Sequence, residues 1–181
     1  HETIARFHDT PNRYANFEKA LAADALGRAK DIAPEVAFIH AREKDCHTLL
    51  DLLAAGEIPL RVTHNDTKIN NVLIRTGAND CAEDEPDQSK VHFDLHLYEV
   101  FAKGYLSTAG ASMSPAEKKS LAWGAKLMTL ECGIRFLTDY LEGDHYFHTA
   151  RPDHNLDRAR TQFTLVRQME EVFDQMLEIV S

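Results

Sequence analysis

Two signals at Ser114-Pro-Ala-Glu117 and Gly143 enclose the longest regular pattern in this chain, and they constrain its fold most strongly. A serine followed three residues later by glutamate is a capping box, in which each side chain satisfies a backbone N–H at the start of a helix. A glycine just past the last helical residue accommodates the left-handed conformation that ends a helix. The sequence therefore predicts one long helix that runs to Leu141.

Further helices are predicted in the N-terminal third of the chain. Asp9-Thr-Pro11 starts one of them, because proline is favoured at the first helical position. One or two shorter helices occupy the segment from Pro34 to Ala55, closed by Gly56 as a C-terminal cap. Apolar residues follow the first start signal at three- and four-residue steps: Tyr14, Phe17, Leu21 and Ala25.

Two more helices are predicted on either side of the long one. The segment from Val91 to Leu106 carries an aromatic and apolar stripe that we interpret as core rather than as a ligand platform: Phe93, Leu97, Phe101 and Tyr105. The last helix starts at Asp153 or Asn155, and its predicted buried face consists of Leu156, Ala159, Phe163, Val166, Phe173 and Met176.

Composition limits the classes of protein to which the chain can belong. Its 181 residues, 44% of them hydrophobic, can bury one substantial core and form no more than one large domain. A net charge of −9 argues against a nucleic-acid partner, since phosphate backbones require clustered Lys and Arg. No segment approaches the roughly 20 apolar residues that span a bilayer. We therefore expect neither nucleic acid nor membrane as a partner.

Cysteine, histidine and acidic residues show no metal-ligand spacing. Cys46, Cys81 and Cys132 are widely separated, and we expect inert thiols in a reducing cytoplasm. The acidic segment 81–89 is interpreted as a solvated loop ahead of a helix rather than as a metal site. The remaining histidines are expected to be surface or capping residues, among them His145, His148 and His154.

The segment 64–71 is polar and lies between two short β-prone runs, 59–63 and 72–74. Such a loop, held by buried strands, can aim reactive groups. It fits the pattern H-x-D-x-x-x-x-N of kinase catalytic loops, in which the Asp accepts the proton of the attacking hydroxyl and the Asn holds a magnesium ion. These positions are Asp66 and Asn71. The sequence therefore predicts a phosphotransferase loop, with an ordinary turn stabilised by Asx hydrogen bonds as the alternative.

The other residues of this loop have less specific roles. Lys68 is either a contact to the transferring phosphoryl group or a solvent-exposed lysine, and the sequence leaves both open. The His64 imidazole is interpreted as bracing the loop backbone rather than transferring a proton. Arg135 lies among apolar residues of the long helix, so its guanidinium needs a partner: a structural ion pair or a bound ligand.

The loop from Thr63 to Leu73 resembles the catalytic loop of the bacterial N-acetylhexosamine 1-kinases, which belong to the aminoglycoside phosphotransferase and choline kinase superfamily. The resemblance extends over nearly the whole chain, and the run from Trp123 to Leu141 is its most specific part. Further matching stretches are His1-Glu-Thr-Ile4, Ala41-Arg-Glu-Lys-Asp45, Ala82-Glu-Asp-Glu85 and His154-Asn-Leu-Asp-Arg-Ala-Arg-Thr-Gln-Phe163.

The resemblance implies a fold and a reaction. The fold would be α+β and predominantly α: residues 1–181 would form the helical C-terminal lobe of a protein-kinase-like fold, with a small β element around the catalytic loop. The reaction would be ATP-dependent phosphorylation of the anomeric hydroxyl of N-acetylglucosamine or N-acetylgalactosamine, with Mg²⁺ as cofactor. Arg135 and Tyr146 would face the sugar, in one cleft with Asp66.

Parts of such an enzyme are not recognisable in the sequence. No candidate nucleotide-binding lobe precedes His1, and no magnesium-binding Asp strand follows Asn71. The relatives would carry about thirty more residues between Leu73 and Gly77, enough for a hairpin. We therefore expect a junction there between segments that are not neighbours in the gene, and no phosphoryl transfer by these 181 residues alone.

Two alternative functions stay open. The first is a kinase for choline, homoserine or an aminoglycoside, although cationic acceptors would favour an acidic or aromatic pocket over Arg135. The second is a non-catalytic remnant that binds a ligand without nucleotide chemistry. Sulfuric-ester hydrolysis is excluded, because none of the three cysteines lies in a Cys-x-Pro-x-Arg or similar run.

Overall fold

The computed structural model describes residues 8–61 and 82–181, and these are predominantly helical. The α-helices are α1 (Thr10–Ala23), α2 (Ala33–His40), α3 (Thr48–Ala54), α5 (Leu95–Ala109), α6 (Pro115–Glu142), α7 (His154–Glu171) and α8 (Phe173–Val180). Short 3₁₀ turns connect them: η1 (Ala29–Asp31), η2 (Asp45–His47), η3 (Gln88–Lys90) and η4 (Gly110–Ser112).

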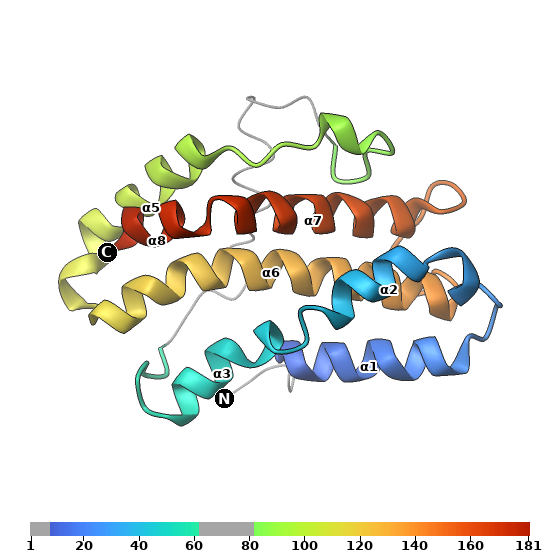
Figure 1. Ribbon diagram of the computed structural model, residues 1–181, viewed down its shortest axis with the longest axis horizontal. Coiled ribbons are helices and arrows are strands. Elements are labelled where there is room, and N and C mark those ends of the chain that lie inside the picture. The colour runs from blue at the N-terminus through green and yellow to red at the C-terminus, as the bar shows by residue number, and fades with distance from the viewer. Residues whose placement is uncertain (1–7, 62–81) are drawn as a thin grey trace.

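The long helix α6 lies at the centre of the described part (Figure 1). Helices α1 and α7 run alongside it on two sides, and α3 also touches it. Helices α5 and α8 pack against each other at one end, where α8 also contacts α6. The fold is thus a helical bundle in which α6 contacts most of the other described α-helices.

Hydrogen bonds between near neighbours set the ends of the principal helices. The Asp9 carboxylate accepts the Asn12 backbone N–H at 2.9 Å and caps α1. At the start of α6, Ser114 Oγ accepts the Glu117 N–H at 3.2 Å, and the Glu117 carboxylate accepts the Ser114 N–H at 2.8 Å. Gly143, with φ of 110°, ends the helix in the left-handed region. The predicted capping box and glycine stop are both confirmed.

The described apolar core falls into two clusters. The larger lies where α1 and α2 meet α6 and α7, and its fully buried members include Phe17, Ile39, Leu130, Ile134 and Leu137. The smaller joins α5, α8 and the ends of α6 and α7, and it includes Val91, Tyr98, Ala125, Met169 and Met176. The burial of these apolar residues sets the positions of the helices. It therefore also sets the positions of the polar residues that lie between the clusters and the surface.

Two predicted helical faces are corrected by the structure. Helix α5 buries Tyr98 and Ala102, whereas Phe101 and Tyr105 of the predicted stripe are 38% and 49% exposed. The reason is that α8 approaches α5 from the Tyr98 side, where the Tyr98 hydroxyl donates to the Met176 carbonyl at 3.4 Å. In α1, Phe17 is buried as predicted and Tyr14 and Leu21 pack partly buried against the larger core cluster, but Ala25 lies beyond the end of the helix and is exposed.

The predicted last helix is two helices. Val172 leaves the helical conformation, with φ of −119° and ψ of 18°, and so separates α7 from α8. Phe173 then meets the Trp123 ring edge-on at a centroid distance of 4.9 Å. Leu156, Ala159, Phe163, Val166 and Met176 are buried as predicted, and Phe173 is partly buried.

No β element occurs among the described residues, and 59–61, the start of the first β-prone run, have no regular structure. The rest of the predicted strand–loop–strand lies outside the described residues, as does the expected junction between Leu73 and Gly77. Within residues 8–61 and 82–181, no helix is both long and apolar enough to cross a membrane.

Candidate functional site

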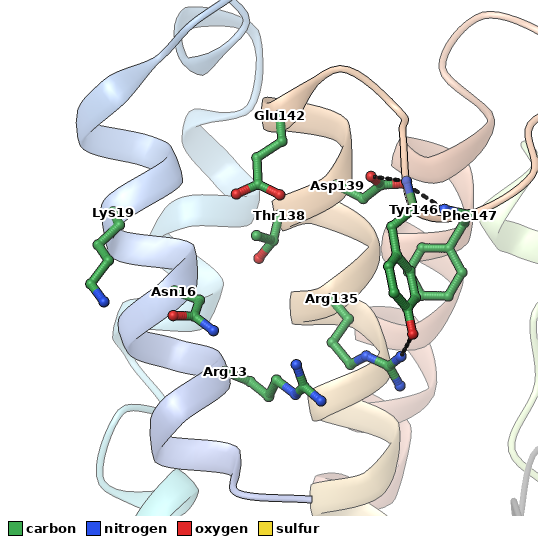
Figure 2. A pocket seen from close by; sticks show the side chains of 9 residues that line it. All are labelled: Arg13, Asn16, Lys19, Arg135, Thr138, Asp139, Glu142, Tyr146 and Phe147. Atoms are coloured by element: carbon green, nitrogen blue, oxygen red, sulfur yellow. Dashed lines mark hydrogen bonds between the residues drawn. The ribbon is translucent and has the colours of Figure 1, made fainter. Parts of the chain in front are cut away.

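A pocket of about 220 Å³ opens between α1 and α6, beside the turn that follows α6 (Figure 2). Pockets that hold drug-sized ligands usually measure about 300–1,000 Å³, so this one suits a smaller molecule. We call it the α1–α6 pocket. Its lining residues are Arg13, Asn16, Lys19, Arg135, Thr138, Asp139, Glu142, Tyr146 and Phe147.

Asp139 organises the wall of this pocket. Its side chain is buried, and Oδ1 accepts the backbone N–H groups of His145 and Tyr146 at 2.9 and 2.8 Å. Its Oδ2 accepts the Phe147 N–H at 3.0 Å and the Asn155 side-chain amide at 2.8 Å. We call this set of four hydrogen bonds the Asp139 clamp. It gives a buried carboxylate the donors that it needs and holds the turn against α6.

A second set of contacts holds the other side of the turn in place. The buried Asn155 amide uses its second hydrogen to donate to Asp144 at 2.9 Å. Arg28 donates to Asp144 and to the Tyr140 carbonyl, both at 2.6 Å. Asp144 has a positive φ of 61°, a conformation that Asp tolerates better than most residues. Asn155 therefore links the two carboxylates that shape the turn.

Arg135 and Tyr146 come together at the mouth of the pocket. The Arg135 guanidinium donates to the Tyr146 hydroxyl at 3.5 Å, and its central carbon lies 5.7 Å from the centre of that ring. The same guanidinium lies 5.4 Å from the Phe147 ring. Tyr146 is 69% exposed, so its ring and hydroxyl are available to a ligand. The arrangement offers guanidinium donors beside an aromatic surface.

The lining charges favour some ligands over others. Arg13, Lys19 and Arg135 are cationic, and Glu142 and Asp139 are anionic. The two Asp139 oxygens are engaged by the clamp, so they offer a ligand little. A cationic ligand would therefore meet three positive side chains and one available carboxylate, whereas a neutral ligand with several hydroxyls would meet donors and acceptors.

The predicted site residues divide into two groups. Arg135 and Tyr146 share the α1–α6 pocket. His64, Asp66, Lys68 and Asn71 lie outside the described residues, so the cleft expected to join Asp66 to this pocket is not tested. The described ranges contain no cluster of three or more His, Cys, Asp or Glu side chains suited to a metal ion.

Sequence reasoning missed most of the other pocket residues, although a signal for them existed. Polar residues recur at three- and four-residue steps on one face of each helix, which is the spacing of a helical stripe. On α1 these are Arg13, Asn16 and Lys19, and on α6 they are Arg135, Thr138, Asp139 and Glu142. That two such stripes face each other follows from packing and cannot be read from either stripe alone.

The acidic segment contacts α7 through Asp84. Asp84 accepts hydrogen bonds from Arg151 at 3.3 Å and pairs with His154 at 2.9 Å. His154 is buried, and its Nδ1 accepts the Ala150 N–H at 2.9 Å. The ring therefore carries its proton on Nε2, which donates to Asp84. Most of the segment is exposed, in agreement with the expected solvated loop, although Asp84 contacts α7. His154, expected at the surface or in a capping position, is buried and accepts a backbone N–H.

Cys46 is one of the thiols for which the sequence predicts no chemistry. It is buried, and burial raises the pKa of its thiol to about 11, with the neighbouring Asp45 charge adding to the effect. A thiol with such a pKa is almost entirely protonated at neutral pH, and the thiol form is a poor nucleophile. Cys81 lies outside the described residues.

A second pocket, of about 250 Å³, lies between α2 and α7. Phe38 and Phe163 form part of its lining, with ring centres 4.9 Å apart. Glu35 and Arg160 pair at 2.6 Å beside them, and the exposed Arg167 completes one side. None of the residues predicted to bind substrate lines it, which makes it a useful control for the α1–α6 pocket.

No known protein-family model matches the chain.

Proposed function

We propose that this chain is the sugar-binding and catalytic-loop lobe of an ATP-dependent kinase that phosphorylates the anomeric hydroxyl of N-acetylglucosamine or N-acetylgalactosamine. The observation that carries the proposal is the meeting of Arg135 and Tyr146 in a pocket suited to a small molecule. The resemblance to the N-acetylhexosamine 1-kinases independently assigns both residues to the sugar. The proposal includes a kinase-like fold, a small β element around the loop, and a cytoplasmic location.

The pocket chemistry supports a neutral, hydroxylated substrate. Guanidinium groups donate several hydrogen bonds in a fixed geometry, which suits sugar hydroxyls and an acetamide carbonyl. The Tyr146 ring adds a surface on which the apolar face of a sugar can rest. Choline or an aminoglycoside would bring positive charge to Arg13, Lys19 and Arg135. The pocket thus favours the hexosamine over the cationic alternatives within the same superfamily.

The reaction assigns a role to each loop residue. Asp66 accepts the proton of the C1 hydroxyl as that oxygen attacks the γ-phosphorus of ATP, and ADP leaves with the cleaved oxygen. Asn71 provides a neutral oxygen ligand for Mg²⁺, a cation that prefers oxygen. Lys68 neutralises charge on the transferring group, and His64 braces the loop. The remaining nucleotide contacts would come from segments beyond these residues.

The experiment uses the complete gene product with ATP, Mg²⁺ and each candidate acceptor, and measures ADP release and the sugar 1-phosphate. We expect turnover with an N-acetylhexosamine and a loss of several orders of magnitude in Asp66→Asn, with nucleotide affinity nearly unchanged. Arg135→Ala should raise KM for the sugar. Arg167→Ala, which removes the same kind of charge from the other pocket, should not. Near-normal turnover in Asp66→Asn would refute the assignment of the base.

A sugar-binding module without kinase activity is the second candidate. The described lining residues of the α1–α6 pocket belong to α1, α6 and the turn that follows α6. A sugar could therefore bind there without a working catalytic loop. N-acetylhexosamine binding by a gene product that binds no nucleotide would favour this candidate over the kinase.

A further inference from the structure

Asp139 lies one helical turn beyond Arg135 on the same face of α6, and its side chain points at the turn rather than into the pocket (Figure 2). Asp139 accepts four hydrogen bonds, all from donors on the turn or on α7. Three of those donors are consecutive backbone N–H groups. Only 3% of the residue is exposed. It therefore cannot contact a ligand to any useful extent, yet it determines the backbone position of Tyr146.

We infer that Asp139 is the positioning residue of the α1–α6 pocket, which acts on the bound sugar by holding Tyr146 against Arg135. This inference rests on the proposed function. Because Arg135 and Asp139 are four residues apart on one helix, they keep a constant spacing. The clamp fixes the turn relative to Asp139 and therefore relative to Arg135. The Tyr146 hydroxyl consequently lies within hydrogen-bonding distance of the Arg135 guanidinium.

The chemistry of the clamp requires a carboxylate. Four N–H donors converge on two oxygens, and an ionised Asp accepts at both. In Asp139→Asn, one oxygen becomes an NH₂ group that faces donors. If the amide nitrogen takes the Oδ2 position, it meets the Phe147 N–H and the Asn155 amide, and those contacts are lost. The other orientation loses the His145 and Tyr146 contacts instead.

The Asn155 amide gives the clamp a second anchor. It joins Asp139 to Asp144, and Arg28 holds Asp144 from the opposite side. Arg28→Gln therefore weakens the same turn from a partly exposed position, without placing an unmatched group in the core. It serves as the milder variant if Asp139→Asn does not fold.

The first measurement is hydrogen exchange of the backbone amides in the complete protein without ligand. The amides of 145–147 should be protected in the wild type and should exchange at least about tenfold faster in Asp139→Asn, since each loses or weakens its acceptor. The amides in the middle of α6 should be unchanged in the same spectrum. Equal protection of 145–147 in both proteins would overturn the inference whatever the ligand.

The second measurement is calorimetric binding of N-acetylglucosamine to the wild type, Asp139→Asn, Tyr146→Ala and the double variant. We expect Asp139→Asn to raise Kd by about tenfold, which corresponds to about 1.4 kcal/mol. If Asp139 acts through Tyr146, it should add little in the Tyr146→Ala background, because the wall that it positions is already gone. Fully additive effects would show that Asp139 acts on binding independently of Tyr146 and would overturn the positioning role.

The two measurements separate the inference from the proposed function. A wild type that binds neither N-acetylglucosamine nor N-acetylgalactosamine would contradict the proposed function, while the exchange result would still decide the clamp. Where the wild type binds sugar and Asp139→Asn is unfolded, Arg28→Gln takes its place in both experiments. Unchanged sugar affinity together with unchanged exchange at 145–147 in that variant would then count against the inference.

Discussion

Among the described glycines, Gly133 leaves the least room for a side chain. It lies on α6 opposite Phe163 of α7, and a Cβ added to it would lie 2.4 and 2.9 Å from two carbons of that ring. Phe163 is itself buried in the larger core cluster and packs on Phe38. Its ring therefore lies between Gly133 and Phe38, and a Cβ at Gly133 can be accommodated only if the ring shifts.

Gly133→Ala should destabilise the protein although alanine favours helices. Alanine in place of glycine in a helix contributes about 0.5–1 kcal/mol of stability, whereas overpacking of a core costs about 1–3 kcal/mol. We expect a net loss of about 1–2 kcal/mol, measured by urea unfolding. Gly124→Ala is the matched control on the same helix, because a Cβ there meets nothing within 4 Å. Equal stabilisation by both substitutions would show that the two helices do not approach as closely as described.

At the scale of the element, the stability of α6 depends on the hydrogen bonds of its first turn. Glu117 closes the capping box and also accepts a hydrogen bond from Arg61 Nε at 2.7 Å. The bond from Arg61, with that from the Ser114 backbone, lowers the pKa of Glu117 from 4.5 to about 2. The charged form is thus favoured by folding, so this contribution is complete above pH 4.5 and is lost as the pH falls toward about 2.

Glu117→Gln should isolate that contribution. Glutamine can keep the capping hydrogen bond to Ser114, but it carries no charge and does not titrate. We expect the wild type to be the more stable at pH 6, and the difference in urea midpoint to shrink progressively below pH 4.5. Urea unfolding at pH 6, 4 and 3 measures it. A difference that stays constant down to pH 3 would contradict the assignment.

At the scale of the whole molecule, Lys126 joins three separate parts of the chain. Its ammonium group on α6 lies 2.7 Å from Asp45 of η2 and 2.9 Å from Glu170 of α7. Only 7% of its side chain is exposed. Arg42 binds the same Glu170 carboxylate from the segment after α2, at 2.9 and 2.5 Å. These four residues form an ion-pair network that holds the α2–α3 region against α6 and α7.

Lys126→Met should cost about 2–4 kcal/mol of unfolding free energy. Removing one partner of a buried pair typically costs about 3–5 kcal/mol, and the loss is smaller here because Asp45 and Glu170 are partly exposed and Arg42 still binds Glu170. Lys103→Met is the control: its pair with Glu99 on α5 is exposed, and such pairs contribute about 0.5 kcal/mol or less. Chemical denaturation of both variants tests the difference, and similar losses would show that burial does not decide it.

The sequence by itself determined where α1 begins and where α6 begins and ends, because those signals act between residues only a few positions apart. Backbone groups at the starts of these helices are satisfied by the side chains of Asp9, Ser114 and Glu117, and α6 ends at Gly143 in the left-handed conformation. Such roles can be recognised without knowledge of the tertiary structure. Arg135 could be singled out from the sequence for another reason. Its guanidinium lies among apolar residues of the helix, so it needs an ion-pair partner or a bound ligand.

Only the tertiary structure decided which residues meet across the bundle. The buried face of α5 and the Asn155 contact to Asp139 both depend on contacts between different elements. The α1 residues that line the pocket are more than a hundred positions from Tyr146 in sequence, and nothing in either segment records the other. Helix ends follow from local hydrogen bonding, whereas a pocket follows from how burial of apolar faces orients whole helices, and that orientation is a property of the complete core.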